Sequence, residues 1–327
     1  MKRRIFIVLS LIAAFVFIQP ISALRPLAAA HATSVFSSDG MPYGAFDQLT
    51  STKLEIVGGT VEIAFAPGEL SVTRAEVVRW VTDSAQAMTQ YFERLPVRRV
   101  RVLIVPTAGK RNVKGTTYGY GGAAIKIALG QFTTVADLKR DWVMTHEMVH
   151  LTFPSMPDAQ NWMQEGIATY VEPIARAQAG QLSAEKVWGD LVAGLPHGLP
   201  KKGDRGLDLT PTWGRTYWGG ALFCLLADIE IRQRTQNRKG LQDALRAIAA
   251  AGGNIETKFS LAHALKIGDL ATGVPVLAER YAQMKATPIE TNLHALWQSL
   301  GVEVRGDTII FHDDAPLADV RRAIVKG

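Results

Sequence analysis

The sequence predicts an α+β fold in which a small mixed sheet with helices precedes a mostly helical lobe. Short segments with the alternation typical of strands lie between residues 53 and 129. From residue 134 onward, apolar residues mostly recur with helical spacing. Hydrophobic residues make up 47% of the chain and charged residues 20%, which argues against a largely disordered protein. We therefore divide the chain into a sheet-and-helix lobe at 53–180 and a mainly helical lobe at 181–327.

The N-terminal segment has the pattern of an export signal. Three basic residues at 2–4 precede an uncharged apolar run at 5–18, which is shorter than the about 20 residues of a membrane span. An Ala-x-Ala pattern follows at 30–32. We predict a signal peptide at 1–32, a flexible lead-in at 33–52, and a periplasmic or secreted protein. The alternative is an uncleaved N-terminal anchor, and only that would hold the protein at a membrane.

Charge and cysteine content exclude some functions. The net charge is +6, but the first 32 residues hold four basic residues and no acid, which leaves 32 basic against 30 acidic residues. This near neutrality gives no support for nucleic-acid binding. Cys224 is the only cysteine, so an intrachain disulfide and a zinc site of several thiolates are excluded. Its apolar neighbours predict a core thiol.

Four segments are predicted as strands of the sheet. Residues 53–57 and 60–65 alternate around a Gly-Gly pair, which predicts a β-hairpin. The β-branched segment 100–105 and the segment 123–129 predict two further strands, and the glycine-rich stretch 107–122 lies between them.

Helix signals follow the second and the fourth of these segments. Thr73 and Glu76 form a capping-box pattern for a helix that ends near residue 95. A second helix is predicted from Thr134 to His150. The remaining expected elements are helices at 159–179, 217–236, 239–251, within 257–300 and at 316–325, a strand at 302–311, and a long surface loop at 194–216.

His146, Glu147 and His150 form the pattern H-E-x-x-H on the second of these helices. Residues four apart on a helix point the same way, so both imidazoles could bind one zinc ion. Glu147 could then act as general base toward a metal-bound water. The alternative is two ordinary core or surface histidines. Apolar neighbours such as Met144 and Val149 predict a buried helix, in which polar groups need partners.

A catalytic zinc site usually has three protein ligands, and Glu165 is the candidate for the third. It lies on the next predicted helix, far enough along the chain for a turn and a return. Gly166 beside it would let that helix pack closely on a neighbour. The alternative is a salt-bridged surface glutamate. Glu172, two turns further on, could support a histidine or be solvated, and both readings stay open.

Tyr217 opens an apolar helix further along the chain. A tyrosine hydroxyl near a zinc site can donate to a developing oxyanion. The residues alone favour a core or capping tyrosine over this role.

In combination, these motifs resemble the gluzincin metallopeptidases, whose catalytic domain has a zincin-like, thermolysin-like fold. The resemblance is to aminopeptidase N relatives and to the glycyl aminopeptidase family, and the stretch 217–245 is more similar to the latter. It covers roughly residues 100–250 and is strongest at 142–172 and 217–245.

The resemblance implies a role for each candidate residue. It implies one Zn2+ per chain, bound by His146, His150 and Glu165, with Glu147 activating the water. Tyr217 falls on the position of the tyrosine that stabilises the tetrahedral intermediate in those families.

The resemblance also implies a place for the substrate. In zincin-like folds an exposed edge strand near the zinc pairs with an extended peptide. We expect the strand at about 121–129 to be that edge, with nearby glycines letting the substrate backbone approach, and an ordinary flexible hairpin is the alternative. The segment 119–124 contains no glutamate, whereas aminopeptidase N relatives carry one there for the substrate's free amine. Endo- and exopeptidase activity therefore both stay open.

The sequence thus predicts an exported zinc-dependent metallopeptidase that hydrolyses peptide or protein substrates. Two alternatives remain: a non-catalytic peptide-binding protein on a peptidase scaffold, and a metal-dependent hydrolase of a non-peptide bond. No nucleic-acid partner is expected. The sequence does not indicate an oligomeric state.

Overall fold

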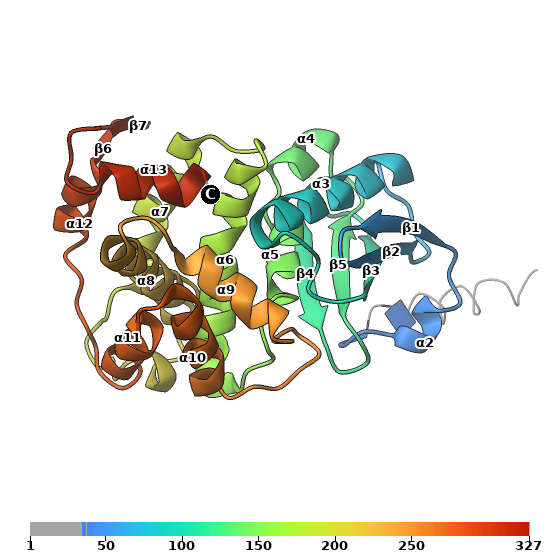
Figure 1. The fold of residues 1–327 in the computed structure, drawn as a ribbon. Coiled ribbons are helices and arrows are strands. Elements are labelled where there is room, and N and C mark those ends of the chain that lie inside the picture. The colour runs from blue at the N-terminus through green and yellow to red at the C-terminus, as the bar shows by residue number, and fades with distance from the viewer. Residues whose placement is uncertain (1–34, 37, 327) are drawn as a thin grey trace, which may run out of the picture.

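The protein is mixed α+β, with a sheet on one side and a helical lobe on the other (Figure 1). The structure, a computed structural model, describes residues 35–36 and 38–326. The predicted signal peptide at 1–32 lies outside these residues and stays a prediction. None of the described helices is long and apolar enough to cross a membrane.

The main sheet has five strands in the order β1-β2-β3-β5-β4. The two hairpins, β1 with β2 and β4 with β5, are antiparallel, whereas β3 is parallel to both of its neighbours. This confirms a mixed sheet and the first hairpin. The strands are β1 (Ser51–Ile56), β2 (Gly59–Phe65), β3 (Arg99–Thr107), β4 (Val113–Tyr118) and β5 (Ala124–Gly130).

One edge of the sheet is β4, which the sequence did not predict as a strand, and the other is β1. The predicted edge at 121–129 is wrong, because β5 lies between β3 and β4 and is mostly buried. The sequence of β4, VKGTTY, contains the strand-favouring residues Val, Thr and Tyr, but it has no apolar run and lies in a glycine-rich stretch; its pairing with β5 identifies it as a strand.

Both faces of the sheet are covered. Helix α3 (Arg74–Phe92), whose predicted capping box is present, packs in one core with the even-numbered residues of β3. The odd-numbered residues Leu103 and Val105 face the other side and pack with Phe46 of α2 (Tyr43–Phe46), as strand alternation requires. Within the segment 33–52, expected to be a flexible lead-in, the described residues Phe36, Met41 and Phe46 instead pack on this second face.

The helix predicted from Thr134 to His150 is divided in two. Helix α4 (Val135–Arg140) ends where Asp141 adopts an extended conformation, and α5 (Val143–His150) follows. The Asp141 carboxylate accepts a hydrogen bond from the backbone N–H of Met144 at 3.2 Å. A side-chain acceptor at this position binds a backbone N–H in the first turn of α5, which has no partner within that helix. This favours the start of a new helix over continuation of α4.

The C-terminal half is helical apart from one hairpin. The predicted strand at 302–311 is two short strands joined by a turn at Gly306. A single core cluster contains residues from both predicted lobes, so the boundary at residue 180 stays a prediction. The elements are α6 (Asn161–Gln178), α7 (Ala184–Gly194), α8 (Gly220–Thr235), α9 (Leu241–Ala250), α10 (Leu261–Thr272), α11 (Val276–Met284), α12 (Leu293–Leu300), β6 (Val302–Arg305), β7 (Thr308–Phe311) and α13 (Ala318–Lys326).

The 194–216 segment differs from the predicted surface loop. It contains the short 3-10 turns η3 (Leu195–Gly198) and η4 (Leu207–Leu209), and several of its residues are buried. Trp162 of α6 donates from its indole nitrogen to the Asp208 carboxylate at 2.7 Å. The segment is therefore packed against the helix that carries Glu165.

Helices α6 and α8 touch through two glycines. A Cβ atom on Gly166 would lie 2.4 Å from the Cα of Gly220, and one on Gly220 would lie 2.2 Å from the carbonyl oxygen of Trp162. These contacts are with backbone, which cannot rotate away. The close packing expected of Gly166 is confirmed.

Gly166→Ala is therefore expected to destabilise the protein by about 1–3 kcal/mol, the usual cost of overpacking. Urea denaturation of the two proteins measures the difference. Gly189→Ala is the control, because a Cβ there would lie 3.4 Å from Ile309, an ordinary contact, and alanine favours a helix by about 0.5–1 kcal/mol. Equal midpoints for Gly166→Ala and wild type would contradict the expectation.

Candidate metal centre

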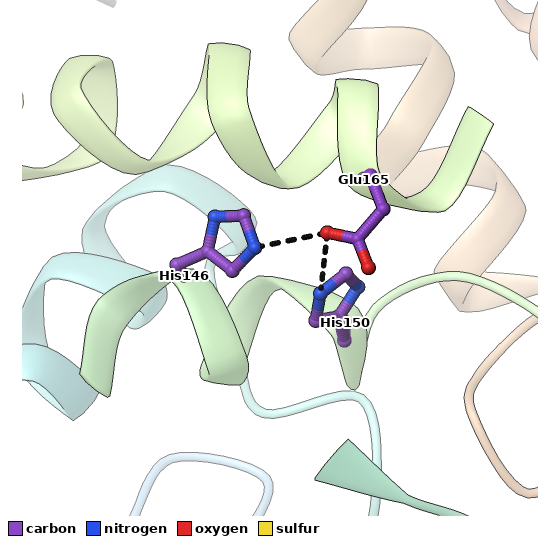
Figure 2. Close-up of side chains that lie close together, drawn as sticks. All are labelled: His146, His150 and Glu165. Carbon is purple, nitrogen blue, oxygen red and sulfur yellow. Dashed lines mark hydrogen bonds and ion pairs between the residues drawn. The ribbon is translucent and has the colours of Figure 1, made fainter. Parts of the chain in front are cut away.

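The three predicted ligands meet between α5 and α6. His146 and His150 lie one turn apart on α5, and Glu165 reaches down to both from α6 (Figure 2). The Oε2 atom of Glu165 lies 3.2 Å from Nε2 of His146 and 3.5 Å from Nε2 of His150. The potential ligand atoms all lie within 4.8 Å of one another.

This donor set fits a zinc ion. Two imidazole nitrogens and a carboxylate oxygen, each about 2.0–2.2 Å from zinc, would lie roughly 3–4 Å apart, close to the separations observed. The Nε2 atom of His146 faces Glu165. Its other ring nitrogen, Nδ1, is buried and has no hydrogen-bond partner among the described residues. Two histidines and a glutamate leave a fourth position for water or substrate.

The charge states of the three residues suit metal binding. Burial lowers the pKa of His146, which favours the neutral imidazole that binds metals. Burial would raise the pKa of Glu165, but hydrogen bonds from His146 and His150 outweigh it and lower that pKa, so the carboxylate is ionised. Burial would lower the pKa of His150, but Glu165 raises it above its ordinary value. A bound cation would replace this proton.

Glu147 is held in place by the edge strand. The hydroxyl of Thr117 lies 2.7 Å from Oε2 of Glu147 and can donate to it. A Cβ on Gly115 would lie 2.4 Å from Cγ of Glu147, so only glycine leaves room for this side chain. Sequence reasoning missed both residues. The signal that could have found them is the mixture of glycines and threonines within the stretch 107–122, to which no element was assigned.

Tyr217 lies beside the histidines, on a π-helical turn, η5 (Arg215–Gly219), which leads into α8. Its ring stacks on that of His146, with 6.2 Å between centroids and an interplanar angle of 18°. Burial, together with the charges of Glu165 and Glu147, raises the pKa of Tyr217 to about 12. The phenol is half-buried, lines the cleft and keeps its proton at neutral pH, as a hydrogen-bond donor must.

Glu172 takes neither of the two roles left open by the sequence. It is buried, and its carboxylate accepts a hydrogen bond from Nη1 of Arg176 at 2.8 Å. Arg176 also donates to the carbonyl of Lys139 at 3.2 Å. The pair therefore links α6 to the end of α4 and has no contact with a histidine in the described part of the chain.

The ligands line a cleft of about 930 Å³. It runs along β4 and α5, which lie side by side, and its far wall is the loop before α10. Gly119 packs there against Ile255, and Glu256 accepts a hydrogen bond from the N–H of Ala123 at 2.7 Å. Gly119 is one of the glycines expected to let a substrate backbone approach. It instead makes room for the backbone of Ile255.

Comparisons with known proteins were made for sequence and for structure. No protein-family model and no curated protein matches the sequence. An aminopeptidase N family protein from Idiomarina loihiensis has a similar structure, with a TM-score of 0.51 and 12% sequence identity, over 79% of this chain and 50% of that one. The fold is aminopeptidase N-like.

A further similar structure is an M1 zinc metallopeptidase from Deinococcus radiodurans, with a TM-score of 0.49 and 16% identity, over 75% of this chain and 53% of that chain. This chain therefore spans about half the length of these structures. The resemblance stated from the sequence motifs is confirmed at the level of the fold, which is aminopeptidase N-like. The closer similarity to the glycyl aminopeptidase family stays a prediction.

Proposed function

We propose that this protein is a zinc-dependent peptidase. The observation that carries the proposal is the meeting of His146, His150 and Glu165, with Glu147 buried beside them in the same cleft. A zinc ion held by the three ligands would polarise the scissile carbonyl and lower the pKa of water. The aminopeptidase N-like fold supports a peptide substrate.

The chain's own residues supply the remaining chemistry. Glu147 takes a proton from the attacking water and passes it to the leaving amine. Thr117 orients the Glu147 carboxylate through their hydrogen bond. Tyr217 donates a hydrogen bond to the oxygen that becomes negatively charged in the transition state.

The edge strand offers a place for the substrate backbone. The outer side of β4 has no strand partner in the described part of the chain, and β4 lines the cleft. A peptide that added to this edge would lie directly beside Glu147. The strand that we propose pairs with the substrate is therefore β4 (Val113–Tyr118), in place of residues 121–129.

The test is hydrolysis of a matched panel of peptides, amides and esters by the mature protein, before and after chelation. Cleavage of peptides that is lost with a chelator and restored by zinc is expected. Cleavage of esters or other bonds alone would favour a hydrolase of a non-peptide bond. Metal binding without cleavage of any substrate would contradict the peptidase.

Tyr217→Phe is expected to lower kcat by about tenfold to a thousandfold, because the variant lacks one donor to the oxyanion. The zinc content should not change, because Tyr217 is not one of the three ligands. Steady-state kinetics and elemental analysis of the same preparation separate the two effects. A wild-type kcat would show that Tyr217 only packs against His146.

We also propose that the protein is exported, on the basis of its N-terminal sequence. Cell fractionation with N-terminal sequencing of the mature chain tests this. A cytoplasmic protein with an intact N-terminus would contradict it.

A further inference from the structure

Tyr217 lies on an unusual piece of helix. The turn η5 (Arg215–Gly219) is π-helical, whereas α8, which follows it directly, is a regular α-helix. A π-helical turn is rare, and it is frequent at functional sites. Because its hydrogen bonds join residues five apart instead of four, its side chains point in directions that a continuous α-helix would not give them. The direction of the Tyr217 phenol therefore depends on what keeps this turn from becoming α-helical.

The first residue of the turn carries a buried ion pair. Nε of Arg215 lies 2.8 Å from Oδ2 of Asp204, and the two side chains are only 4% and 2% exposed. Nη1 of Arg215 also donates a hydrogen bond to the carbonyl oxygen of Gly198 in η3. The other carboxylate oxygen of Asp204 accepts a hydrogen bond from the backbone N–H of Gly206 at 2.8 Å. The guanidinium thus ties η5 both to η3 and to the loop before η4.

Stability alone is a poor explanation for this ion pair. Taking two charges out of water costs about as much free energy as their attraction returns, and apolar side chains of similar size often serve a core equally well. A buried pair can instead favour one arrangement of the chain, because each charge is satisfied only where its partner lies. In this protein the favoured arrangement includes the π-helical turn.

The rest of the turn is also held by close packing. A Cβ atom on Gly198 would lie 2.3 Å from the backbone carbonyl carbon of Trp218, so η3 and η5 touch through their backbones. Beyond the turn, Gly220 meets Gly166 of α6. The turn is therefore fixed at its start by the ion pair, in its middle by η3 and at its end by α6.

The contacts of the Tyr217 ring do not by themselves fix its hydroxyl. The ring stacks on that of His146, and it lies 6.2 Å from the ring of Trp213 at an interplanar angle of 30°. Stacked rings tolerate a range of offsets. The place of the phenol oxygen in the cleft is therefore determined by the backbone of η5.

We propose that Asp204 is a positioning residue for Tyr217: through its ion pair with Arg215 it holds the π-helical turn that directs the phenol to the metal centre. This inference rests on the proposed function, in which the phenol donates to the oxyanion. Such a donor acts only at about 2.7–3.1 Å from the oxygen that becomes charged, so a small shift of the turn lowers turnover. The three proposed metal ligands lie on α5 and α6, so zinc binding should not change.

A double-mutant cycle with Tyr217→Phe tests the role of Asp204. In the wild-type background, Asp204→Asn should lower kcat about tenfold or more, as loss of an oxyanion donor does, and kcat/KM by the same factor. In the Tyr217→Phe background it should have little further effect, because the donor is already absent. Wild-type kcat, or an equal loss in both backgrounds, would overturn the inference.

A second variant separates positioning from folding. Asp204→Asn leaves a buried guanidinium without its counter-ion, which destabilises a protein, whereas Asp204→Leu combined with Arg215→Met removes both charges and should fold. The double variant should show the same loss of kcat. The matched control is Glu172→Gln, which makes the same carboxylate-to-amide change in the buried pair with Arg176 that links α6 to α4. An equal loss of kcat in this control would overturn the inference. Zinc content and the urea midpoint are measured for every variant.

Fluorine NMR measures the position of the phenol without turnover. The chain has seven tyrosines, and after labelling with 3-fluorotyrosine the Tyr217 resonance is the one missing from Tyr217→Phe. This resonance should shift in Asp204→Asn and in the double variant but not in Glu172→Gln. A shift in a protein that hydrolyses no peptide would support the positioning role and contradict the peptidase. Hydrolysis with an unchanged resonance would support the peptidase and overturn the positioning role.

Discussion

Glu147→Gln is expected to lower peptide hydrolysis by about a hundredfold to ten-thousandfold while zinc stays bound at one ion per chain. Glutamine preserves the shape of the side chain in its tight space against Gly115. It cannot accept the proton of the attacking water, because an amide is not a base at neutral pH. The three ligands are unchanged, so metal binding should be too.

The measurement is kcat together with elemental analysis on the same sample. Glu165→Gln is the informative comparison, because it makes the same carboxylate-to-amide change at a proposed ligand only one helix away. That variant should lose zinc as well as activity. Hydrolysis by Glu147→Gln at the wild-type rate would eliminate Glu147 as the base and with it the mechanism.

His146→Ala is expected to abolish zinc binding, so that about one zinc per wild-type chain becomes close to none. The change removes one of three ligands and leaves two, too few for a zinc site with an open position. Elemental analysis after incubation with zinc and desalting measures the outcome. His294→Ala is the control, because His294 is exposed on α12 and lines no part of the cleft.

His146 is buried, so its replacement could also disturb folding. Far-UV circular dichroism of both variants checks for this, and His150→Ala gives an independent test of the same site. Wild-type protein that binds no zinc even after incubation would refute the three-ligand site. A non-catalytic peptide-binding protein would then be a better interpretation than a zinc peptidase.

The proximity of the three candidate ligands could be predicted from the sequence because helical spacing fixes most of it locally. His146 and His150 are placed together by one turn of α5 alone. Glu165 needed only a turn and a second helix. The predicted capping box of α3 was equally local, since it depends on a threonine and an acid three residues apart, and α4 begins with the same arrangement.

Features that depend on partners distant in the sequence were missed. Strand β4 has strand-favouring residues but neither an apolar run nor regular alternation, and its pairing with β5 appears only in the fold. The burial of Glu172 with Arg176, and of Arg215 beside Asp204, could not be read from charge patterns, which usually indicate solvated faces. The segment before β1 has a polar, glycine-containing sequence, yet Phe46 packs it onto the sheet.

The contact between Gly166 and Gly220 has a consequence for how this site can vary. Glu165 precedes one of these glycines, and Tyr217 lies three residues before the other. The distance between the proposed metal ligand and the proposed oxyanion donor is therefore fixed by a single crossing of two backbones. A substitution at this crossing would move both residues at once. Zinc affinity and turnover should therefore change together in such variants. Independent tuning of either property would have to come from groups whose replacement leaves the crossing in place, such as Thr117 on the sheet side or the hydroxyl of Tyr217.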